Sequence, residues 1–171
     1  SVGVVVMGFD SVSVSQSDEQ VKIDVVDAVL SGMRYPGGRL HPRLRGEGMV
    51  YVVHAQSIPL LDTGMFQIYA LTSQDKVKTV RRIINEEVRL LTKKGITKSE
   101  LILAKSQVKH YYLDQLDSLS SRSQYHALQS LYLVRPFSLK ERLDILETIT
   151  TSDVQMAAKR LFRRSQTLLL N

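Results

Sequence analysis

The sequence predicts an α+β fold, in which a mainly antiparallel or mixed sheet has helices packed on one face. Three observations lead to this prediction. The strand-like apolar segments, apart from one at the end of the chain, precede residue 72, a short turn joins two of them, and helical periodicity dominates afterwards. No repeat, low-complexity segment or linker divides the chain, so we expect residues 1–171 to form a single domain.

The first half of the sequence contains the clearest strand signals. Residues 4–9 form a short apolar run, and Ser17–Gln20 has the capping-box pattern that begins a helix, which we expect to end at Gly32. Residues 49–55 and 65–71 are rich in β-branched and aromatic residues, and turn residues separate them. We therefore expect these two strands to form an antiparallel hairpin.

The second half of the sequence is dominated by helix signals. Further capping boxes begin at Thr97 and Ser138, and a helix between them is expected to end before Pro136. The last helix is expected to begin within residues 151–153, and residues 167–170 have the composition of a terminal strand. Helices after a hairpin are consistent with one helical layer on a sheet.

Composition excludes several classes of protein. The net charge is +6, 43% of the residues are hydrophobic and 23% are charged, which is typical of a globular domain. The absence of cysteine excludes disulfides, zinc–thiolate sites and a cysteine nucleophile. No apolar run approaches the roughly 20 residues of a membrane span. Residues 1–6 begin directly in a strand-like run, so we expect no signal peptide and a domain cut from a longer protein.

The basic excess raises the possibility of nucleic-acid binding. Lys159 and Arg160 lie on a predicted helix, but acidic residues such as Glu86, Glu87 and Asp153 are interleaved with the cations, without aromatic stacking residues. This pattern is more typical of solvated helix faces, so we expect no nucleic-acid partner.

The histidines do not form a recognisable metal-binding motif. The four histidines are His41, His54, His110 and His126, and none belongs to an H-E-x-x-H or H-x-x-E-H sequence. The sequence also lacks a G-x-S-x-G nucleophile elbow and a phosphate-binding loop. We therefore expect no metal site within this chain.

One local group of residues could bind a substrate. Arg45 lies at the end of a short predicted helix, and Tyr51 lies in the strand that follows. A guanidinium and a phenol can both donate hydrogen bonds to a peptide carbonyl or a developing oxyanion. The alternative is that Arg45 caps the helix and Tyr51 packs on the sheet, and the residues alone favour this alternative.

The order of several motifs resembles the later domain of pitrilysin/insulinase-type zinc metallopeptidases, which has the mitochondrial processing peptidase-like fold. The resemblance is carried by Gly-Arg-Leu at 38–40, Tyr51, the segment Lys-Gly-Ile-Thr-Lys-Ser-Glu-Leu at 94–101, and Ile-Thr-Thr-Ser-Asp-Val-Gln at 149–155. It spans nearly the whole chain. Each motif is modest alone, but their order and spacing together are specific.

The resemblance implies a substrate-binding lobe that is inactive alone. In such enzymes an earlier lobe holds zinc through H-x-x-E-H, and a later lobe contributes an arginine and a tyrosine to the substrate and the tetrahedral intermediate. Arg45 and Tyr51 fall on those positions, with Arg43 and Gly38 as further substrate-binding candidates. Five residues separate Arg45 from Tyr51 where the family has six, so Arg43 remains an alternative for the arginine.

The partners implied by this resemblance are a peptide or unfolded polypeptide and a homologous zinc-binding lobe, in the same chain or in a partner subunit. No cofactor is expected in this chain, and zinc is expected in that other lobe. The second hypothesis is a scaffold or assembly subunit that uses the same fold for protein–protein interaction without peptidase activity.

Overall fold

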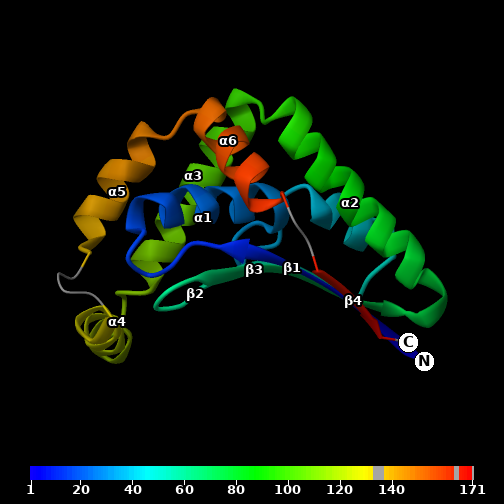
Figure 1. Cartoon of the computed structure of the whole chain (residues 1–171), viewed down its shortest axis with the longest axis horizontal. Helices are drawn as coiled ribbons and strands as arrows, with labels where there is room; N and C mark the ends of the chain where they lie inside the picture. Colours follow the sequence, from blue (N-terminus) through cyan, green and yellow to red (C-terminus); the bar gives the residue numbers. More distant parts are fainter. Residues whose placement is uncertain (133–136, 164–165, 171) are drawn as a thin grey trace.

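The computed structural model describes residues 1–132, 137–163 and 166–170, and these form an α+β fold, as predicted (Figure 1). Within them, a sheet has the strand order β2-β3-β1-β4, and each neighbouring pair is antiparallel. The predicted hairpin is confirmed as β2–β3. The strands are β1 (Val2–Ser11), β2 (Val52–Pro59), β3 (Gly64–Ser73) and β4 (Gln166–Leu170).

The face of the sheet that meets the helices follows from the alternation of side chains along the strands. Val5, Met7 and Phe9 of β1 are buried on this face, and Ile68 of the neighbouring strand β3 pairs with Met7. Phe9 packs edge-on against Phe162, which follows the last helix, with ring centroids 4.8 Å apart. These side chains form the core between the sheet and the helical layer.

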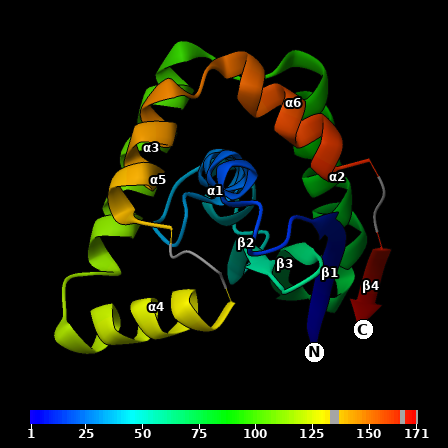
Figure 2. The same cartoon turned by 60° about the vertical axis from the view of Figure 1, so that its left-hand side comes forward.

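The helical layer is arranged around α1, which packs against α3, α6 and β2. Figure 2 looks nearly along α1 and shows α2, α3, α5 and α6 arched around it. None of the helices in the described part of the chain is long and apolar enough to cross a membrane. The helices are α1 (Ser17–Ser31), α2 (Val77–Lys94), α3 (Lys98–Asp114), α4 (Leu119–Tyr132), α5 (Leu139–Thr148) and α6 (Thr151–Leu161), with a π-helical turn η1 (His41–Gly46) and a 3-10 turn η2 (Gln74–Lys76).

Helix caps agree with the sequence in the second half of the chain. The capping boxes at Thr97 and Ser138 are both formed, and α6 begins at Thr151 with Thr150 as its cap. The capping box predicted at Ser17 is wrong, because Ser17 is already the first helical residue of α1. Gln16 occupies the cap position, and its side chain accepts a hydrogen bond from the backbone N–H of Ser13 instead.

The first strand of the hairpin is displaced from its predicted position. Residues 49–51 precede β2, which begins at Val52 and continues to Pro59. The backbone N–H of Met49 donates to the Leu44 carbonyl at 2.7 Å, so this residue belongs to the loop after η1. The predicted end of a helix before Pro136 lies outside the described residues, and α4 is described to Tyr132.

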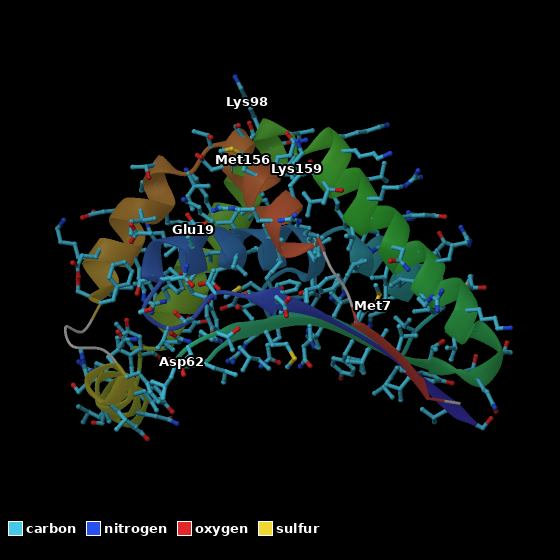
Figure 3. All side chains as sticks on the ribbon, viewed as in Figure 1. Met7, Glu19, Asp62, Lys98, Met156 and Lys159 are labelled. Atoms are coloured by element: carbon cyan, nitrogen blue, oxygen red, sulfur yellow. The ribbon has the colours of Figure 1, made fainter. Side chains whose placement is uncertain are left out.

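The helix α4 differs from the others in its packing. No residue of α4 is buried, and it lies apart from the arch of helices in both views (Figures 1 and 2). On the opposite side of the molecule, the side chains of Lys98 and Met156 point away from the sheet (Figure 3). The sheet and α1 therefore form the centre of the fold, and α4 lies at its periphery.

Candidate functional site

Arg45 and Tyr51 lie at the two ends of one loop. Arg45 is in the last turn of η1, and Tyr51 immediately precedes β2. Gly48 between them has a φ of +62°, a left-handed conformation that lets the loop reverse. The backbone N–H of Tyr51 donates to the Leu71 carbonyl at 2.8 Å, which fixes the tyrosine to the hairpin.

The side chains of both residues are available to a ligand. Arg45 is exposed, and 64% of Tyr51 is exposed. Among the described residues, neither side chain forms a hydrogen bond or an ion pair. Arg45 therefore does not cap a helix through its guanidinium, and Tyr51 does not pack into the core. The geometry leaves a guanidinium and a phenol free to donate to a carbonyl or an oxyanion.

Two histidines border this loop, although their sequence spacing gave no indication of it. His54 of β2 stacks on Tyr69 of β3, with ring centroids 6.2 Å apart. Burial lowers the pKa of His41, and the positive charges of His54 and Arg45 lower it further. The Nε2 atom of His41 is buried without a hydrogen-bond partner. The surroundings of Arg45 thus contain a histidine that is disposed to remain neutral.

Arg43 has a different environment from Arg45. Its guanidinium donates to Glu87 at 2.7 Å and to Glu86 at 3.1 Å, so it joins η1 to α2. These hydrogen bonds raise the pKa of Arg43, and Glu87 is only 5% exposed. Because both contacts are within the chain, the geometry favours Arg45 over Arg43 as the arginine that meets a ligand.

Gly38 has a structural reason for being glycine. Its φ is +68°, and a Cβ built there would lie 2.6 Å from the backbone of Leu30. The neighbouring Arg39 donates to Glu100 at 2.6 Å and to the Gly95 carbonyl at 2.9 Å, which ties this loop to the start of α3. The hydrogen bond from Arg39 is the main reason that the pKa of Glu100 falls to about 2. Because Gly38 has no side chain, the loop after α1 can pass close to the α1 backbone at Leu30.

A second feature, which the sequence analysis missed, is a cavity of about 500 Å³ between α1, β2, α3 and α4. Asp24 and Asp27 line it from α1, and each is only 5% exposed. Burial raises the pKa of both carboxyl groups, that of Asp27 to about 7. The signal in the sequence is the placement of two aspartates within the apolar run from Val21 to Leu30.

A metal centre has no counterpart in this geometry. Within residues 1–132, 137–163 and 166–170, no three His, Asp or Glu side chains are placed to hold a metal ion together. The Arg45–Tyr51 loop itself offers two hydrogen-bond donors, an exposed guanidinium and an exposed phenol.

Residues 1–108 match the family model described as the peptidase M16 inactive domain. The chain belongs to the M16 peptidase family. This membership confirms the resemblance to pitrilysin/insulinase-type metallopeptidases. The match covers β1 to most of α3, and so includes Gly38, Arg43, Arg45 and Tyr51.

Individual proteins are similar to this chain in sequence, and several solved structures are similar to it in fold. The uncharacterized zinc protease YmxG of Bacillus subtilis is 27% identical over 139 residues, covering 78% of this chain and 34% of the relative. A crystal structure of a protease from Helicobacter pylori superposes with a TM-score of 0.87 at 20% identity, covering 99% of this chain and 41% of that one. A peptidase M16 inactive domain from Pseudomonas fluorescens gives a TM-score of 0.85 at 17% identity, covering 99% of this chain and 41% of that one. The chain thus spans about a third of the length of the B. subtilis relative.

Proposed function

We propose that this chain is the later, substrate-binding lobe of a zinc metalloendopeptidase of the M16 family, inactive by itself. The observation that carries this proposal is the pair of exposed donors, Arg45 and Tyr51, on one loop of an inactive-type M16 domain. The zinc lies in a homologous lobe, in the same polypeptide or in a partner subunit. The relatives named zinc proteases are longer than this chain, which leaves room for such a lobe.

In this proposal the two lobes close around an unfolded peptide. The zinc site supplies the activated water and the Lewis acid when its lobe is loaded with metal. Arg45 and Tyr51 approach from the opposite side and donate hydrogen bonds to the peptide carbonyl and then to its oxyanion. Because donors of this kind act on charge that develops during the reaction, their loss should lower kcat more than binding.

The test uses the full-length protein with its zinc-binding lobe. We expect Arg45→Ala or Tyr51→Phe to lower kcat on a fluorogenic peptide by on the order of 10²–10³, with zinc content unchanged. Arg81→Ala, which removes an exposed arginine from α2, is the matched control and should leave kcat unchanged. Full activity in both site variants would remove this loop from the mechanism.

An assembly role is the competing hypothesis, and the same preparation distinguishes it. A full-length protein that binds a partner subunit but cleaves no unfolded peptide, and that lacks H-x-x-E-H, would support the assembly role. Cleavage that depends on Arg45 and Tyr51 would exclude it.

A further inference from the structure

The cavity beside β2 contains a buried negative charge without a contacting cation. Asp24 is fully engaged, because its two oxygens accept from Gln20 Nε2 at 2.8 Å and from the Tyr112 hydroxyl at 2.5 Å. Asp27 accepts only from the Ser31 hydroxyl, at 2.6 Å through Oδ1. Among the described residues, no donor hydrogen-bonds to Asp27 Oδ2 and no cation forms an ion pair with it. Asp27 therefore retains an unused acceptor at 5% exposure.

The two arginines of the cavity are held by aromatic rings. The Arg142 guanidinium lies 5.4 Å from the ring centroid of Tyr112 and 5.7 Å from that of Tyr125. The Arg34 guanidinium lies 5.0 Å above Tyr111 and is exposed. Arg142 offsets the charge of Asp24 at a distance and Arg34 offsets that of Asp27, but among the described residues neither guanidinium forms an ion pair with these carboxylates.

The walls of the cavity are suited to an organic cation. Tyr69, Tyr111, Tyr125 and Tyr132 line it, and their rings can stack on an ammonium or a guanidinium group. A buried carboxylate with an unused oxygen adds a charge-assisted hydrogen bond, which is roughly twice as strong as a neutral one. An anionic ligand would be repelled by Asp27, and an apolar ligand would leave its carboxylate unpaired.

Part of the cavity wall is formed by the edge of the sheet. β2 is an edge strand, and its residues 54–57 line the cavity. Tyr51 immediately precedes the same strand. At a rise of about 3.3 Å per residue, the strand extends about 13 to 20 Å from Tyr51 to residues 55–57. An extended peptide held at Tyr51 would therefore reach the cavity about four to six residues farther along.

We propose that this cavity binds a lysine or arginine side chain of an extended peptide, with Asp27 as the carboxylate that receives the cation. The inference rests on the proposed function, because it takes the peptide held at Arg45 and Tyr51 as the source of the side chain. It adds a specificity site remote from the reacting carbonyl. The helix α4 forms the outer wall through Tyr125 and Tyr132, and having no buried residue of its own it can adjust to the occupant.

The test compares two peptide series on the full-length protein. Each peptide has one lysine at a varied position, or norleucine at the same position, and Kd and kcat/KM are measured for both. We expect one position, about four to six residues from the scissile bond, at which lysine binds about 10- to 100-fold more tightly than norleucine. Asp27→Asn should abolish this preference and leave the norleucine peptides unchanged.

The control variant is Asp62→Asn, which neutralises an exposed carboxylate in the β2–β3 turn (Figure 3). It should retain the preference for lysine. Equal binding of lysine and norleucine peptides, or an equal loss in Asp62→Asn, would overturn the inference. If norleucine peptides were neither bound nor cleaved by the wild type, the proposed function itself would fail. If N-acetyl-lysine amide alone bound as tightly as the best peptide, the site would serve a free cation and the peptide assignment would be overturned.

Discussion

The buried Asp27 carboxylate should make the stability of this domain depend on pH in an unusual direction. Burial is the main reason that its pKa rises from 3.8 to about 7, with a further increase from Asp24 and opposing effects of Ser31 and Arg34. A carboxyl group with a raised pKa binds its proton more tightly in the folded protein than in the unfolded chain. The free energy of unfolding therefore decreases as pH rises from about 4 to about 7, and remains lower above that.

The size of this effect follows from the change in pKa. A rise from 3.8 to about 7 is about three pH units, and each unit corresponds to about 1.36 kcal/mol, so the loss reaches up to about 4 kcal/mol. Asp27→Asn removes the titrating group and keeps an oxygen that accepts the hydrogen bond from Ser31. We expect the variant to be about 2 to 4 kcal/mol more stable than the wild type near pH 8, with this difference vanishing near pH 4.

Urea denaturation followed by circular dichroism between about pH 4 and pH 8 measures this difference. Asp62→Asn is the control. It removes an exposed carboxylate, so the free energy of unfolding of this variant should depend on pH as it does in the wild type. A difference between Asp27→Asn and the wild type that does not change with pH would refute the reasoning. So would a variant that is less stable than the wild type near pH 8.

Three further predictions concern contacts that hold the candidate site. Gly38→Ala should destabilise the domain by about 3 kcal/mol or more, because the new Cβ would sit on a left-handed backbone and overlap the backbone of Leu30. Gly48→Ala has the same left-handed backbone but no such clash, so it should cost about 1 kcal/mol. Equal losses of the two variants in urea denaturation would contradict this explanation. Arg43→Ala should cost about 2 kcal/mol, since it leaves the buried Glu87 without its charged donor, and an unchanged denaturation midpoint would argue against that role. Thr150→Ala removes the cap of α6 and should lower the free energy of unfolding by about 1 kcal/mol, a change visible as a lower Tm.

Helix boundaries that depend on local chemistry were predictable from the sequence. The capping boxes at Thr97 and Ser138 form because each needs only a hydroxyl and a carboxylate within four consecutive residues. The same pattern failed at Ser17, because the preceding turn supplies Gln16 as the cap residue. The hairpin was predictable as a pair of strands, but β2 starts at Val52 because hydrogen bonds to Leu44 and Leu71 determine the loop before it.

The site was predictable only in part. The order of motifs indicated the M16 family, with Arg45 at the end of a short helix and Tyr51 in the strand that follows, and the family match covers both residues. The spacing of the motifs could not distinguish Arg45 from Arg43. Tertiary structure separates them, because α2 brings two carboxylates to Arg43 and none to Arg45.

The sequence by itself determined the fold class, the family and most helix starts, because these depend on periodicity and on short-range hydrogen bonds. Tertiary structure alone decided which charges are paired. The folding of β2, α3 and α4 around α1 places Asp27 in one cavity with aromatic rings from segments distant in sequence, and burial there raises its pKa. Burial and ion pairing are properties of the assembled layers, so the basic specificity proposed for this cavity could be recognised only there.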